Sequence, residues 1–107
     1  MPQEIRADDW AAEVVQSPLP VLVDFYSTYC GPCRTLAPLI DRLTSEYEGF
    51  AKVLKLDTAE RGEIAVALGI TSVPTVVAFR DGEEVGRLVG LRPESEYRRL
   101  LSQAGVP

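Results

Sequence analysis

The chain has 107 residues, a formal net charge of −5 at neutral pH, and the apolar and charged content of an ordinary globular protein. This length predicts one domain, over residues 1–107, that can bury its own core. The acidic balance argues against nucleic acid as a partner, and no apolar run is long enough for a membrane span. Two cysteines and no histidine exclude zinc sites of cysteine and histidine, four-thiolate zinc sites and histidine-activated nucleophiles.

The first predicted elements are a short edge strand over Gln3–Arg6 and a helix over Trp10–Gln16. Either Asp8 or Asp9 can cap the start of this helix, and the segment Ser17–Pro20, with its two prolines, ends it. The helix face that we expect to point inward carries Trp10, Val14 and Val15.

A strand–helix–strand unit follows. Val21–Tyr26 is almost continuously apolar, which is typical of a central parallel strand covered on both faces. Apolar residues at helical spacing predict a helix over Cys33–Tyr47 that is closed by Gly49 and kinked at Pro38. Ala51–Asp57 is the next strand, and we expect it to run parallel to the first with a right-handed crossover.

The second half of the chain predicts a helix, a hairpin and a last helix. The helix covers Glu60–Leu68, and the hairpin strands Thr75–Arg80 and Glu84–Val89 flank the turn Asp81-Gly82-Glu83. Pro93 opens the last helix. Its core-facing residues are Tyr97, Leu100, Leu101 and Ala104. The order of elements predicts an α/β fold with a mixed sheet, parallel strands first and antiparallel strands last, and helices on both faces.

Both cysteines lie in the stretch Tyr29-Cys30-Gly31-Pro32-Cys33-Arg34, where a strand passes into a helix. Residues three apart on a helix have Cα atoms roughly 5 Å apart, within reach of a disulfide. The helix N-terminus also favours a thiolate over a thiol. The segment Met1–Arg6 lacks the features of a signal peptide, so we expect a cytoplasmic location, where this spacing is more often catalytic than structural.

The sequence resembles the thioredoxin family from about Trp10 to Leu101. The resemblance is carried by Cys30-Gly31-Pro32-Cys33 after Val23-Asp24-Phe25, and by Ser72-Val73-Pro74-Thr75 further on. It implies the thioredoxin fold and a monomeric protein-disulfide reductase without metal or bound cofactor. The partners it implies are disulfide-containing client proteins and a thioredoxin reductase.

The resemblance also implies roles for the residues around the cysteines. Cys30 is the expected attacking thiol and Cys33 the resolving thiol. Asp24 interrupts an apolar strand. From the residues alone it is equally well a proton acceptor with a raised pKa or a structural acid, either hydrogen-bonded or in water on an edge strand. The family's buried aspartate, which assists the second cysteine, matches Asp24. Lys55 matches a family lysine near that acid, although it can also be read as a solvated lysine.

We expect the substrate-binding surface to comprise Tyr29, Gly31, Pro32, Val73, Pro74 and Gly90. The family has a cis proline where Pro74 stands, whereas most X-Pro bonds are trans. A cis bond there would let Val73 lend its backbone to an incoming peptide. Gly90 matches a glycine that leaves room in the same groove.

The sequence departs from the common family pattern at three places. Tyr26 and Tyr29 stand where tryptophan is usual, and Arg34 replaces a lysine. These changes leave open which substrates and which reductase the protein prefers. Two alternative functions also stay open: an oxidant or isomerase with a shifted redox poise, and a non-redox module that binds partners in the groove around the cysteines.

Overall fold

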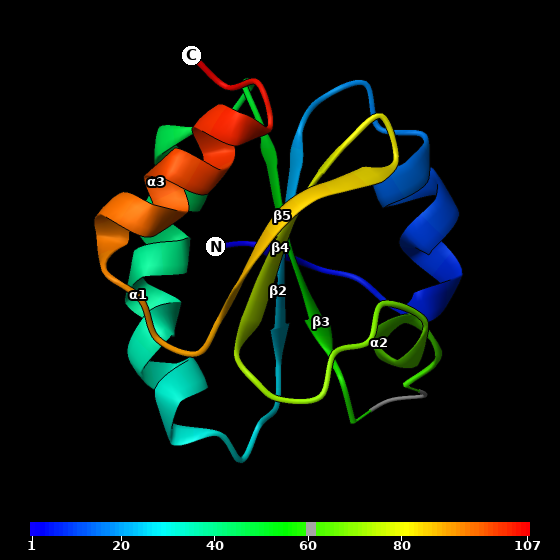
Figure 1. Ribbon diagram of the computed structural model, residues 1–107, viewed down its shortest axis with the longest axis vertical. Helices are drawn as coiled ribbons and strands as arrows, with labels where there is room; N and C mark the ends of the chain where they lie inside the picture. Colours follow the sequence, from blue (N-terminus) through cyan, green and yellow to red (C-terminus); the bar gives the residue numbers. More distant parts are fainter. Residues whose placement is uncertain (60–61) are drawn as a thin grey trace.

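The computed structural model describes residues 1–59 and 62–107, and its centre is a mixed five-stranded sheet (Figure 1). The strands lie in the order β1-β3-β2-β4-β5. Their bounds are Gln3–Glu4 for β1, Val21–Tyr26 for β2, Lys52–Asp57 for β3, Thr75–Arg80 for β4 and Glu83–Val89 for β5. The first three strands pair in parallel, and β4 and β5 are antiparallel to their neighbours. The predicted mixed sheet is therefore confirmed.

Helices cover both faces of this sheet. On one face lie α1 (Gly31–Glu46) and α3 (Glu94–Gln103), at the left of Figure 1. On the other face lie α2 (Glu63–Ala67) and two short helical segments, η1 (Ala7–Asp9) and η2 (Ala11–Val15). No helix within the described residues is long and apolar enough to cross a membrane. The helix predicted over residues 60–68 corresponds to α2, and its first two residues lie outside the described part of the chain.

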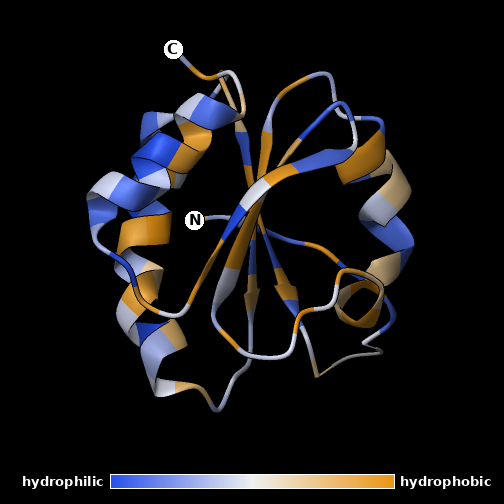
Figure 2. Ribbon diagram, viewed as in Figure 1, coloured by the Kyte–Doolittle hydropathy of each residue, from blue (hydrophilic) through white to orange (hydrophobic). Residues whose placement is uncertain are grey.

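Each face of the sheet has its own apolar cluster, and the apolar sides of the helices face inward (Figure 2). The cluster under α1 and α3 consists of Leu22, Leu36, Ile40, Leu43, Ala51, Val53, Val76, Ala78, Tyr97, Leu100, Leu101, Ala104 and Val106. The cluster on the other face consists of Ile5, Val14, Val21, Val23, Phe25, Leu54, Leu56, Val77 and Phe79. The strand β2 contributes alternate residues to the two clusters because successive side chains point to opposite faces. The predicted core residues of α3 are all buried.

The N-terminal helix differs from its prediction. The chain forms a 3₁₀ turn at η1 and then a π-helical segment at η2, in which the Gln16 N–H donates to the Ala11 carbonyl over 2.9 Å. Asp9 does accept a backbone hydrogen bond, from the Arg6 N–H, but it does so from the end of η1 and not as the residue before the helix. The wider π turn leaves Val14 buried and Val15 47% exposed, so the expected inward position of Val15 was wrong.

Other boundaries also move: β1, for example, ends at Glu4 instead of Arg6. The helix α1 starts at Gly31, two residues before its predicted start, and Pro38, where a kink is predicted, lies inside it. In the hairpin, Arg80 pairs with Glu83, so the turn consists of Asp81 and Gly82 alone. Both have positive φ, 53° and 80°. This is the combination that a tight two-residue hairpin turn requires, and it explains the Asp-Gly pair.

Candidate redox site

The two cysteines form a disulfide at the N-terminal end of α1. Cys30 is the extended residue before the helix, and its Sγ accepts a hydrogen bond from the Cys33 N–H over 3.1 Å. Their Cα atoms are 5.2 Å apart, in agreement with the separation of roughly 5 Å expected from helix geometry. Gly31 and Pro32 begin the helix, where the missing N–H of proline leaves no hydrogen bond unmade. The predicted strand-to-helix junction is confirmed.

The two sulfurs differ more in their surroundings than in exposure. Cys30 is 9% exposed and Cys33 is 6% exposed, so the two differ little in accessibility. Cys33 lines a partly open cavity between β2 and α1, whereas the Sγ of Cys30 lies 3.8 Å from the carbonyl oxygen of Val73. Tyr29, directly before the pair, is 95% exposed. The disulfide thus has an inner side at Cys33 and an outer side at Cys30.

The outer side is bordered by the loop before β4. The bond between Val73 and Pro74 is cis, as the family resemblance implied. The Gly90 N–H donates to the Pro74 carbonyl over 2.8 Å, which ties the end of β5 to this loop. Gly90 has a φ of 78°, and no atom of the part of the chain that the structure describes lies within 4 Å of the place where a Cβ would stand. Glycine is therefore favoured here by the backbone conformation rather than by lack of space.

The inner side contains a buried carboxyl. Asp24 lies in the middle of β2 and is 6% exposed, and its Oδ1 has no hydrogen-bond partner among the described residues. Burial raises the pKa of Asp24 to about 6, while Lys55 acts to lower this pKa and Glu4 to raise it. The structure thus argues against both structural readings of Asp24, since β2 is a central strand and the acid is not fully hydrogen-bonded.

Lys55 lies next to Asp24 on the neighbouring strand, where the two residues are register partners. Its side chain is 29% exposed, and its Nζ lies 3.7 Å from the Oε1 of Glu4 and 5.4 Å from the centre of the Tyr26 ring. The Tyr26 hydroxyl donates to the same Glu4 oxygen over 2.6 Å. The pKa of Tyr26 is raised, first by burial and then by this hydrogen bond.

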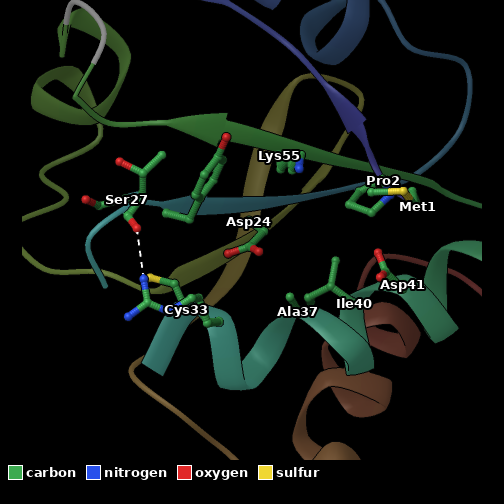
Figure 3. A pocket seen from close by; sticks show the side chains of 12 residues that line it. Met1, Pro2, Asp24, Ser27, Cys33, Ala37, Ile40, Asp41 and Lys55 are labelled. Atoms are coloured by element: carbon green, nitrogen blue, oxygen red, sulfur yellow. Dashed lines mark hydrogen bonds between the residues drawn. The ribbon is translucent and has the colours of Figure 1, made fainter. Parts of the chain in front are cut away.

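A cavity of about 200 Å³ connects these inner groups (Figure 3). Its lining includes Asp24, Cys33, Lys55 and Tyr26, together with Met1, Pro2, Ser27, Thr28, Arg34, Ala37, Ile40 and Asp41. In Figure 3 the Asp24 carboxyl points from β2 toward α1, into the space beside Cys33 and Ala37. Arg34 is directed back toward the preceding loop, where it donates to the Thr28 carbonyl over 3.0 Å.

The predicted site residues therefore separate into two groups around the disulfide. Asp24 and Lys55 are on the cavity side, while Val73, Pro74 and Gly90 form the loop-side border. Sequence reasoning missed Glu4, which reaches the cavity-side group from the edge strand β1. The sequence predicted the edge strand on which Glu4 lies, but not the register of β1 against β3, which sets Glu4 beside Lys55.

The comparisons with known proteins agree on one family. The family model named Thioredoxin matches residues 2–103. Similar proteins include "Thioredoxin 1" of Nostoc sp., 42% identical over 100 residues that cover 94% of each chain. "Thioredoxin" of Synechocystis sp. is 46% identical over 91 residues, 85% of each chain. "Thioredoxin M-type, chloroplastic" of Spinacia oleracea is 42% identical over 93 residues, 87% of this chain and 51% of the spinach one.

Proposed function

Because the chain belongs to the thioredoxin family of thiol–disulfide oxidoreductases, we propose that it reduces disulfides in client proteins with Cys30 and Cys33. In this proposal a thioredoxin reductase returns the oxidised pair to the dithiol. The supporting observation is a disulfide at the N-terminal end of α1 that has a buried carboxyl, Asp24, on the cavity that Cys33 also lines.

Cys30 is the proposed nucleophile. The unpaired N–H groups and the positive end of the dipole at the start of α1 favour its thiolate. The Cys33 N–H, which donates to the Cys30 sulfur in the disulfide, would stabilise a thiolate at the same position. The thiolate attacks one sulfur of a client disulfide and forms a mixed disulfide, and the other client sulfur leaves as a thiolate.

Cys33 is the proposed resolving thiol, and Asp24 the acceptor of its proton. With a pKa of about 6, Asp24 is mostly ionised at neutral pH yet basic enough to take up a proton. The Cys33 thiolate then attacks the Cys30 sulfur and breaks its bond to the client. The client's remaining sulfur leaves as a thiolate and takes up a proton. Two electrons have passed to the client, and the cysteines are joined again as a disulfide.

The proposed client surface lies on the outer side of the disulfide. There an extended peptide can pair with the backbone of Val73 as an added strand, beside Pro74 and Gly90. The exposed ring of Tyr29 offers an aromatic surface that also carries a hydroxyl. Gly31 and Pro32, between the cysteines, complete this surface and tune the redox poise of the pair.

We propose that the protein is a monomer, a single thioredoxin domain over residues 1–107, and that it acts in the cytoplasm. The location follows from the expectation drawn from the sequence. Some similar proteins are named as chloroplastic, so fractionation of the source cells, with detection of the native protein, is the measurement that decides the location.

The first test of the proposed function is the equilibrium reduction potential of the Cys30–Cys33 pair, titrated against a dithiol buffer. A potential below the cytosolic glutathione poise is expected for a reductase. A potential well above that poise would make the protein an oxidant or isomerase instead. The titration is sensitive, because about 30 mV corresponds to about 1.4 kcal/mol for a two-electron couple.

The cysteine variants then separate the two thiols. With insulin as the disulfide substrate, Cys33→Ser should accumulate a mixed disulfide through Cys30, whereas Cys30→Ser should show no turnover. The double variant Cys30→Ser, Cys33→Ser tests the non-redox alternative. If that variant fully replaced the wild-type protein in its cell, a partner-binding module would be favoured over a reductase.

A further inference from the structure

Three charged residues lie side by side across the parallel strands β1, β3 and β2. Glu4 is the register partner of Lys55, and Lys55 is the register partner of Asp24. Side chains on neighbouring strands in register point to the same face of a sheet. All three therefore lie on the α1 side, and Figure 3 shows Lys55 and Asp24 at the cavity that Cys33 lines.

In this row Lys55 is paired with Glu4 and not with Asp24. The Nζ of Lys55 lies 3.7 Å from the Oε1 of Glu4, and that oxygen also accepts the Tyr26 hydroxyl over 2.6 Å. Across residues 1–59 and 62–107, no ion pair joins Lys55 to Asp24, and the Oδ1 of Asp24 has no hydrogen-bond partner. The Tyr26 hydroxyl holds the Glu4 carboxylate in place, and this carboxylate in turn holds the ammonium of Lys55.

The charge of Lys55 is consequently shared between two carboxyls with different surroundings. The side chain of Glu4 is 45% exposed, while Asp24 is 6% exposed. Lys55 acts to lower the pKa of Asp24 and Glu4 acts to raise it. The other titratable or charged groups near Asp24 are Tyr26 on β2, Cys33, Arg34 and Asp41 on α1, Tyr97 on α3 and the chain start at Met1. The register partner of Asp24 on β4 is the apolar Val76.

We propose that Glu4 is a positioning residue for thiol–disulfide exchange: held by the Tyr26 hydroxyl, it binds Lys55 and limits how far that ammonium neutralises the Asp24 carboxyl. Glu4 touches neither the sulfurs nor the client, and it acts through Lys55. This inference rests on the proposed function, because it takes Asp24 as the acceptor of the Cys33 proton. In this way the edge strand of the sheet sets the proton affinity of a carboxyl two strands away.

The test is the titration of the Asp24 carboxyl carbon by ¹³C NMR in the oxidised protein. In Glu4→Gln the titration midpoint should fall by at least about 0.3 pH units, which is about twofold in proton binding. Tyr26→Phe should shift it in the same direction but by less, since Glu4 keeps its charge and loses only its anchor. The matched control is Glu48→Gln, an exposed glutamate just beyond the C-terminal end of α1, and it should leave the midpoint unchanged.

A second measurement separates positioning from a structural role. The pH dependence of insulin reduction by Glu4→Gln should move downward together with the Asp24 midpoint. The proposal is overturned if Glu4→Gln titrates like Glu48→Gln, if it changes only the unfolding midpoint, or if the pH profile stays in place while Asp24 shifts. The NMR titration does not depend on turnover. A wild-type protein that fails to reduce insulin would therefore overturn the proposed function, and the Asp24 titration would still decide the effect of Glu4.

Discussion

The two faces of the sheet are built from the same strands, yet they differ at one point. On the face covered by α2, η1 and η2, no buried side chain of the described residues is ionisable, and Trp10 packs against Phe25 and Phe79 with ring centres 6.1 and 5.2 Å away. The face covered by α1 and α3 has a larger apolar cluster, but a carboxyl, Asp24, interrupts it. A cavity of about 200 Å³ lies beside this carboxyl.

The difference between the two faces follows from β2, whose successive side chains point to opposite sides of the sheet. Val21, Val23 and Phe25 point to the apolar face, and Leu22 and Asp24 point to the other. The buried Asp24 carboxyl, whose Oδ1 has no hydrogen-bond partner among the described residues, lowers the stability of the folded state because burial desolvates its charged form. One face of the sheet therefore contributes stability alone, while the other gives up part of its stability to hold the Asp24 carboxyl at the cavity that Cys33 lines. This comparison can be tested by substitutions on each face.

The largest expected effect is on the apolar face. Phe25→Ala removes a fully buried aromatic ring and should lower the free energy of unfolding by about 3–5 kcal/mol in a urea titration. Phe25→Leu, the matched control, should cost less than about 1.5 kcal/mol. Neither variant should change the reduction potential of the folded protein, because Phe25 points away from the cavity. A shift in potential would mean that the two faces are not separate in function.

The second largest effect is expected on the face covered by α1 and α3, where replacing Asp24 should raise the free energy of unfolding instead of lowering it. Burial raises the pKa of Asp24 from 3.8 to about 6, so the folded state binds its proton more tightly than the unfolded state does. Stability is therefore lost as the pH rises from 3.8 to about 6, a loss of about 3 kcal/mol that persists at higher pH. Asp24→Asn should recover this amount at pH 8 and slow the resolving step.

The pH dependence of the free energy of unfolding distinguishes an effect of the Asp24 charge from an effect of packing. The stability gain of Asp24→Asn should disappear below the pKa of 3.8, where the wild-type carboxyl is protonated in both states. Asp8→Asn makes the same chemical change at an exposed residue and should leave stability nearly unchanged at pH 8. A gain from Asp24→Asn that is equal at all pH values would show that packing, and not charge, limits stability on this face.

The contrast between the faces was partly predictable from the sequence. Successive side chains of a strand point to opposite faces, which predicts that Asp24 and Phe25 lie on different sides of β2, and apolar residues at helical spacing predict the helix that follows. Those signals are local. The register of β1 against β3, which brings Glu4 to Lys55, depends on pairing between distant segments, and two residues of strand carry too little pattern to fix it.

Other features lay beyond local reasoning for similar reasons. The cis bond before Pro74 came from the family resemblance, because nothing in the residues themselves distinguishes it from the commoner trans form. The inward position expected for Val15 assumed the period of an α-helix, and the π-helical turn of η2 changed that period.

The smallest expected effect concerns a polar contact at the rim of the apolar face. Lys52 on β3 donates to the Glu13 carbonyl oxygen over 2.7 Å, and its Nζ lies 3.2 Å from the Glu13 Oε1. Lys52→Met should lower the free energy of unfolding by about 1 kcal/mol, because it removes both contacts. Glu13→Gln keeps the carbonyl and should cost less, about 0.5 kcal/mol. Urea unfolding measures both changes. If either variant altered the Asp24 titration, the polar groups of this face would also act on the redox site, and the separation of the two faces would fail.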